Sequence, residues 1–183
     1  MPPGALRTYL RHATAQAHAR VDALLASGFA DVADYAAYLR AMHSFVRSLV
    51  QAGVAPSLQS RLARLQDDMA LLRLDALPMT ASSTPPDHPA GRLAWEYVFE
   101  GSSLGARVLV RRAAELGYID GRGASFLSAH AASAAWPALL QRMEALQPGP
   151  DELDRIGAAG RAAFEAIEAA LRIALHTNPE PVT

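Results

Sequence analysis

A threonine, a histidine and an aspartate share one face of the first helix that the sequence predicts. In the stretch LRHATAQAHARVDALL, Thr14, His18 and Asp22 recur every four residues, a spacing that stacks side chains on one side of an α-helix. Val21 and Leu25 border the same face, so the imidazole lies beside an apolar stripe. A neutral imidazole can bind a metal through one ring nitrogen while a carboxylate holds the N–H of the other. Asp22, one turn after His18, is placed for that supporting role.

A single histidine of this kind favours a metal that brings other donor atoms with it. Zinc normally takes three or four protein ligands, whereas haem supplies four nitrogens and needs one axial histidine. The spacing around His18 therefore favours haem over a bare metal ion. The alternative is a partly buried histidine that pairs with Asp22 for packing alone, which is ordinary helix chemistry. Surface or packing roles are expected for the remaining histidines, His12, His43, His88, His130 and His176.

Two glycines four residues apart interrupt a second predicted helix. Each costs a helix about 1 kcal/mol relative to alanine, and Gly101 and Gly105 together strip one helical face of its side chains. Ser102 and Ala106 widen this flat strip. Two explanations fit: a second helix packs against the strip, or a planar ligand lies against the bare backbone.

The elements that position these residues are all predicted to be helices. Alanine, leucine and arginine dominate, and β-branched and aromatic residues are too scattered for the alternation of strands. Apolar residues spaced three and four apart predict an all-α chain. The expected helices run from Pro3 to about Leu25, from the N-cap Asp31 to Gly53, over about 57–74, over 91–117, over about 122–146 with a kink or break at Pro137, and from Asp151 to about Leu175.

Length, charge and composition narrow the class of protein. The 183 residues, 51% of them hydrophobic, predict one domain over 1–183, with an exposed loop at 78–91 and a disordered tail at 177–183. The 17 basic and 18 acidic residues nearly cancel, which argues against nucleic acid or an acidic membrane as a partner. The absence of cysteine excludes disulfides, thiolate nucleophiles and cysteine-bound metals. Without a signal-peptide pattern or an apolar run of 18 residues, we expect a cytoplasmic protein.

Together the two helices resemble the haem-binding walls of the heme oxygenase family. The stretch LRHATAQAHARVD is similar to the family's proximal helix, in which a histidine ligates the iron and an acidic residue follows one turn later. The stretch YVFEGSSLGAR is similar to the distal helix, particularly that of the bacterial branch associated with phytochrome photoreceptors. A weaker resemblance extends through residues 136–146 and around Phe164.

The resemblance implies a helical bundle of the heme oxygenase type with a haem slot between these two helices. It assigns His18 as the proximal iron ligand, supported by Asp22. The distal wall would consist of Gly101, Ser102, Gly105 and Ala106. Arg11 falls where the family often has a basic residue near a haem propionate, and Thr14 and Tyr97 lie within the same two motifs and are expected to contact the haem.

The implied activity is the oxidative cleavage of haem to biliverdin, carbon monoxide and free iron, with haem as both substrate and cofactor. Electrons would come from a separate reductase or ferredoxin, and a phytochrome is a candidate recipient of the biliverdin. Two residues depart from the family pattern: Ser102 replaces a distal acidic residue, and Ala106 replaces a second glycine. Two other functions stay open: a haem carrier or sensor on the same fold, and a helical interaction module without haem.

Overall fold

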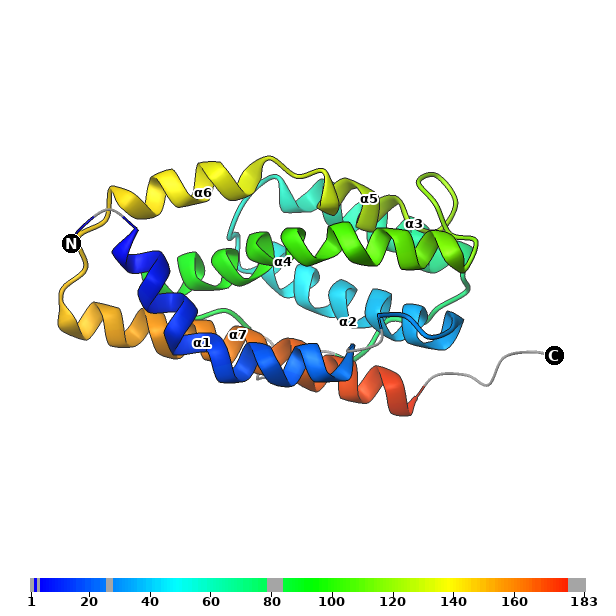
Figure 1. Cartoon of the computed structure of the whole chain (residues 1–183), viewed down its shortest axis with the longest axis horizontal. Helices are drawn as coiled ribbons and strands as arrows, with labels where there is room; N and C mark the ends of the chain where they lie inside the picture. Colours follow the sequence, from blue (N-terminus) through cyan, green and yellow to red (C-terminus); the bar gives the residue numbers. More distant parts are fainter. Residues whose placement is uncertain (1, 3, 26–27, 79–83, 178–183) are drawn as a thin grey trace.

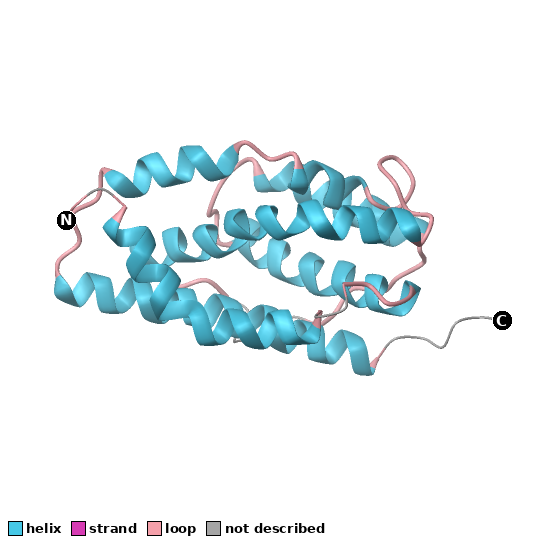
Figure 2. Ribbon diagram, viewed as in Figure 1, coloured by secondary structure: helices cyan, strands magenta, loops and turns pink. Residues whose placement is uncertain are grey.

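The all-α prediction is confirmed. The computed structural model describes residues 2, 4–25, 28–78 and 84–177, and within these ranges the chain forms helices and no strand longer than an isolated bridge (Figures 1 and 2). The helices are α1 (Ala5–Leu24), α2 (Val32–Gln51), α3 (Leu58–Leu71), α4 (Pro89–Glu115), α5 (Ser125–Ala131), α6 (Ala135–Glu144) and α7 (Pro150–His176). None of these helices is both long enough and apolar enough to cross a membrane.

Helix α1 begins at Ala5, after the predicted start at Pro3, which lies outside the described residues, and α2 follows its predicted N-cap. Both helices face the core as their sequences predict. The buried side of α1 consists of residues spaced three and four apart, Leu6, Leu10, Thr14, Ala17 and Val21. Asp31 is the N-cap of α2, because its carboxylate accepts a hydrogen bond from the backbone N–H of Asp34. Almost every residue of α2 from 35 to 49 is buried, which places this helix inside the bundle.

Helix α7 packs along three other helices, α1, α2 and α4. Helix α3 packs against α2 and α5. The largest fully buried side chains lie inside this arrangement: Trp95, Tyr35, Phe45, Phe99 and Phe126. Helices α1 and α4 both pack against α7 but barely touch each other. The bundle therefore holds its first and fourth helices apart, and space for a site lies between them.

The predicted fifth helix is divided, but the proline does not divide it. Helix α5 ends at Ala131 and α6 begins at Ala135, so the break falls at residues 132–134. Pro137 lies in the first turn of α6, where a missing N–H costs no hydrogen bond. The hydroxyl of Ser133 accepts a hydrogen bond from the backbone N–H of Ala135 in this break.

The segments predicted to be loop and tail are described only in part. Helix α4 begins at Pro89, earlier than expected, with the His88 ring accepting a hydrogen bond from the N–H of Gly91. Gly91 is buried, whereas Pro78, Thr84 and Asp87 are exposed. Residues 79–83 lie outside the described residues, as do residues 178–183 of the predicted tail.

Candidate functional site

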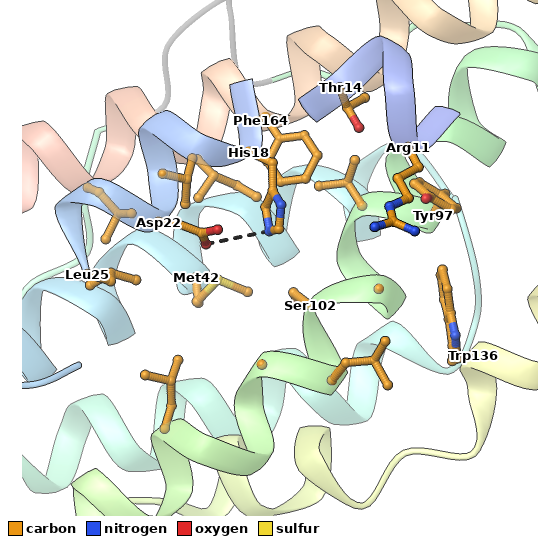
Figure 3. Close-up of a pocket in the computed structure, with 18 of the residues that line it drawn as sticks. Arg11, Thr14, His18, Asp22, Leu25, Met42, Tyr97, Ser102, Trp136 and Phe164 are labelled. Atoms are coloured by element: carbon orange, nitrogen blue, oxygen red, sulfur yellow. Dashed lines mark ion pairs between the residues drawn. The ribbon is translucent and has the colours of Figure 1, made fainter. Parts of the chain in front are cut away.

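A cavity of about 570 Å³ lies between α1 and α4, with α2 and α7 contributing to its lining (Figure 3). This volume falls within the range of roughly 300–1,000 Å³ that is typical of small-molecule and cofactor sites. Most of the exposed lining is apolar, including Met42, Phe164, Ile167 and Leu171. Of the residues predicted for the site, all but Ala106 line this cavity: Arg11, Thr14, His18, Asp22, Tyr97, Gly101, Ser102 and Gly105.

The wall formed by α1 carries His18. Its ring lies 5.0 Å from the ring of Phe164, centroid to centroid, and its Nε2 atom is 3.5 Å from Oδ1 of Asp22. The carboxylate thus faces Nε2, and binding of a metal through that nitrogen requires the ring to turn away from Asp22. Both side chains are more than half exposed, at 57% and 66%, so such an exposed pair costs little to separate.

Thr14 belongs to the same wall but its hydroxyl is engaged elsewhere. Its Oγ1 donates a hydrogen bond of 2.7 Å to the carbonyl of Leu10, one turn earlier. The side chain is 3% exposed and is packed against α7, where its methyl group lies close to Gly160. Thr14 therefore shapes the cavity and offers it no hydrogen-bond donor in this arrangement.

The opposite wall is the glycine strip of α4. A Cβ atom added at Gly105 would meet no atom within 4 Å, and one added at Gly101 would lie 3.4 Å from the ring of Trp136, an ordinary van der Waals contact. No neighbouring helix packs against Gly105, so helix packing does not explain its presence. Gly105 thus leaves open space that the protein itself does not fill, while the Trp136 ring borders Gly101.

Ala106 does not belong to this wall, contrary to its predicted place beside Gly105. Its side chain is 1% exposed and is directed into the core, on the same side of α4 as the buried residues Ser103 and Ala113. The reason is helical geometry, because successive residues point about 100° apart around the helix axis. Ala106 follows Gly105 in the sequence, but its side chain therefore points away from the strip.

A basic cluster forms one end of the cavity. Arg11 and Arg7, one turn apart on α1, line it together with Tyr97 and Trp136 (Figure 3 labels all but Arg7). The Arg7 guanidinium carbon lies 5.8 Å from the centre of the Trp136 ring. Burial raises the pKa of Tyr97, and the charges of Arg7 and Arg11 oppose that rise. Arg7 was not predicted, although its four-residue spacing from Arg11 is a signal that could have found it.

A buried polar network lies directly behind Ser102. The Ser102 hydroxyl is 2.8 Å from Nε2 of His130, whose Nδ1 is 3.0 Å from a guanidinium nitrogen of Arg61. A second Arg61 nitrogen donates to the hydroxyl of Ser133, which in turn donates to Glu100 at 3.4 Å. Burial first, and the charge of Arg61 second, lower the pKa of His130 to about 3. Burial raises the pKa of Glu100, with Arg61 opposing the rise.

His130 is the site-adjacent residue that sequence interpretation missed. It was expected at the surface or in simple packing, yet it is fully buried between the rings of Phe99 and Phe126 and bonded at both nitrogens. Its helix, α5, is fixed by the buried carboxylate of Asp68 on α3, which accepts hydrogen bonds from the N–H groups of Ser125 and Phe126. Arg61 and Ser102 lie 69 and 28 residues away in sequence, and no local pattern links them to His130.

Among the described residues, no three His, Asp or Glu side chains gather closely enough to hold a metal ion. A metal bound by His18 in this cavity would therefore depend on a group that brings its own donor atoms.

Comparisons with known proteins bear on the fold. The structure is similar to the solved structure of heme oxygenase from Neisseria meningitidis in its NO- and CO-bound forms, with a TM-score of 0.74 over 97% of this chain and 98% of that chain. The two sequences are 22% identical, and at this level the similarity establishes a shared fold. No family model matches the chain, and no curated protein matches it significantly.

Proposed function

We propose that the cavity between α1 and α4 binds haem and that the protein is a heme oxygenase, which cleaves haem to biliverdin, carbon monoxide and iron. The observation that carries the proposal is the pairing of a lone histidine on one wall with a side-chain-free strip of helix on the other. The shared fold with a heme oxygenase supports it, and the motifs around His18 and Gly101 are similar to those of that family.

The residues that line the cavity fit a flat, largely apolar group with an anionic edge. The open space in front of Gly105 admits a planar ring against the helix backbone. The apolar lining from α2 and α7 suits a macrocycle, and Arg7 and Arg11 at one end suit its carboxylates. His18, without a cluster of other ligands, suits a metal with four donors of its own.

When bound, haem supplies the redox-active iron and the ring carbon that is oxidised. The residues of the chain would bind and orient it: His18 would hold its iron, and Arg7 and Arg11 would pair with its carboxylates. That pairing at one end of the cavity would limit the orientations in which the group can bind. The exposed backbone at Gly105 would let it lie close to α4.

Haem titration followed by absorption spectroscopy tests the proposal. We expect His18→Ala to lower the affinity for ferric haem by more than the roughly 10–100-fold that loss of a supporting group costs a metal site. His12→Ala is the matched control, because His12 is an exposed histidine of the same helix and does not line the cavity. Unchanged haem binding in His18→Ala would overturn the assignment of the ligand.

Turnover separates the enzyme from the second candidate, a haem carrier or sensor. No carboxylate of α4 lines the cavity. Ser102 lines it instead, and Glu100 is buried behind Ser102, 3% exposed. This feature favours a non-catalytic role. The loaded protein, given a reductant and oxygen, should lose its Soret band and gain the spectrum of biliverdin. Retention of the haem spectrum under these conditions would establish the carrier instead.

The proposed reaction needs a source of electrons, and its biliverdin needs a recipient. The electrons would come from a separate reductase or ferredoxin, and the exposed Leu104 and Val108 beside the cavity are a candidate contact surface for it.

We further propose a cytoplasmic protein whose biliverdin can serve a phytochrome. Mixing the loaded enzyme with an apo-phytochrome and following the absorption of the assembled photoreceptor tests that transfer.

A further inference from the structure

Ser102 is the one hydroxyl-bearing residue of the α4 strip, residues 101–105, that lines the cavity, and the hydrogen-bond partners of its hydroxyl lie behind the wall. Ser102 lines the cavity (Figure 3), while its oxygen is 2.7 Å from the carbonyl of Phe99 and 2.8 Å from Nε2 of His130. A hydroxyl has one hydrogen to donate and two lone pairs to accept with. The direction of each bond therefore decides what the hydroxyl offers to a bound molecule.

Arg61 determines the direction of the first bond. A guanidinium donates and never accepts, so Nδ1 of His130, 3.0 Å from Arg61, must accept. A neutral imidazole that accepts at Nδ1 carries its hydrogen on Nε2. Burial and the charge of Arg61 lower the pKa of His130 to about 3, which keeps the ring neutral at physiological pH. His130 consequently donates to Ser102 from Nε2.

The backbone determines the direction of the second bond. The carbonyl of Phe99 can only accept, so the hydrogen of the Ser102 hydroxyl is directed to it. In the other tautomer of His130, Nε2 and the carbonyl of Phe99 would both need the single hydrogen of the Ser102 hydroxyl. The donors of Arg61 would then also face the N–H at Nδ1. The Nε2–H tautomer is the one in which all three hydrogen bonds form together.

We propose that Arg61 and His130 are positioning residues that fix Ser102 as a hydrogen-bond acceptor toward the cavity, so that the α4 wall binds a donor such as water in preference to an anion that can only accept. With one lone pair facing His130 and the hydrogen facing Phe99, the second lone pair remains for the cavity. The inference about the ligand rests on the proposed function. The inference about the hydrogen bonds does not, because it concerns residues present without haem.

The first test is made on the haem-free protein. Long-range proton–nitrogen NMR spectra distinguish the two nitrogens of each histidine ring, and His130→Gln identifies the signals of His130. Near neutral pH we expect an accepting Nδ1 and a protonated Nε2 for this ring. The opposite tautomer, or a ring that is already charged, would overturn the proposal whether or not the protein binds haem.

Variants at position 61 test whether Arg61 sets the tautomer. Arg61→Lys retains a group that can only donate and should retain the Nε2–H tautomer, whereas Arg61→Met should give a mixture of the two. Arg64→Met, an exposed arginine on the same helix, is the control and should leave the spectrum unchanged. If Arg61→Met does not fold, the parent protein and Arg61→Lys still decide the matter, because either one in the Nδ1–H form refutes the proposal.

The second test measures what the wall offers to a ligand, on the haem-loaded protein. Fluoride binds ferric haem and can only accept a hydrogen bond, so a serine that donated to it would strengthen its binding. Because Ser102 accepts, Ser102→Ala should bind fluoride as tightly as the parent or more tightly. A loss of about fivefold or more, the size expected for one donated hydrogen bond, would overturn the proposal. If the protein binds no haem at all, the proposed function fails, and the NMR test decides the hydrogen bonds independently.

Discussion

Helix α4 contains Gly101 and Gly105, and helix α7 contains Gly157 and Gly160. The two pairs differ in what lies next to them. In α7, a Cβ atom added at Gly157 would lie 2.7 Å from the hydroxyl of Tyr9, and one at Gly160 would lie 2.9 Å from the methyl carbon of Thr14. In α4, an atom added at Gly105 would meet nothing within 4 Å. The α7 glycines allow close contact with α1, whereas Gly105 of the α4 strip borders open space.

The surroundings of a glycine in a helix indicate what compensates its cost. Each glycine costs its helix about 1 kcal/mol relative to alanine. In α7 the close packing of α1 compensates that cost, since a larger residue would push the two helices apart. In α4 no protein contact compensates it at Gly105. The proposed haem would occupy the open space at Gly105 and would give the glycine a role there.

The largest effect is expected behind the α4 wall, on acidification. The pKa of His130 is lowered from 6.5 to about 3 in the native state by burial and by Arg61, so the unfolded chain binds a proton that the folded chain excludes. Its contribution to stability is complete above about pH 6.5 and is lost as the pH falls toward 3. We expect the free energy of unfolding to fall by on the order of 1 kcal/mol per pH unit in this window, as measured by urea unfolding.

Two variants and one local measurement make this prediction specific. His130→Gln does not titrate and should give a flatter pH profile, whereas His12→Gln, exposed on α1, should follow the parent. The α1 side chains that lie against Gly157 and Gly160 are Tyr9, Thr14 and Leu10, none of which is a histidine or a carboxylic acid. Hydrogen exchange should therefore show α4 and α5 loosening before this part of α1 and α7, and equal loosening would argue against His130 as the cause.

Filling the α7 pair should cost the next largest amount. Gly160→Leu places a side chain where its first carbon is already 2.9 Å from Thr14 and 3.1 Å from Leu10, both buried. Overpacking of this kind costs about 1–3 kcal/mol, and we expect the upper end in urea unfolding of the haem-free protein. Ala158→Leu, exposed on the same helix, should change stability by less than about 0.5 kcal/mol. Equal stability of the two variants would refute the close approach of α1.

Filling the α4 strip should have the opposite sign. Gly105→Ala should stabilise the haem-free protein by up to about 1 kcal/mol, because it gains helix propensity and meets no neighbour. Gly105→Leu projects into the cavity and should weaken haem binding about tenfold, or about 1.4 kcal/mol, without unfolding the protein. The matched control is Ala114→Leu on the exposed side of α4. A destabilised Gly105→Ala would mean that the strip packs against protein after all.

The smallest effect is expected at the basic end of the cavity. Arg7→Gln or Arg11→Gln removes one charge near the proposed propionates, and each should lower haem affinity a few-fold, by about 0.5–1 kcal/mol, because exposed ion pairs are weak. Raising the salt concentration should reduce the difference from the parent. Arg155→Gln, an exposed arginine of α7 that does not line the cavity, should have no effect on the titration. An equal loss in Arg155→Gln would show that only the net charge matters.

Much of the fold was predictable because its signals are local. The spacing of Leu6, Leu10 and Val21 sets the buried side of α1, and Asp31 caps α2 as expected. The sequence predicts a break between α5 and α6 at Pro137, because proline interrupts helices, yet a proline in the first turn is compatible with a helix. The break falls where the Ser133 hydroxyl accepts hydrogen bonds from the nearby N–H of Ala135 and from Arg61, which tertiary contact brings in from α3.

Which residues share a helical face can be derived from local spacing, because side chains three and four apart on a helix lie together. His18 with Asp22, and Gly101 with Gly105, follow from that rule. What each face contacts depends on the packing of the helices: a neighbouring helix lies at Gly160, an open cavity at Gly105, the core at Ala106, and His130 behind Ser102. A glycine in a helix has the same local geometry everywhere, whereas its neighbours come from distant parts of the chain.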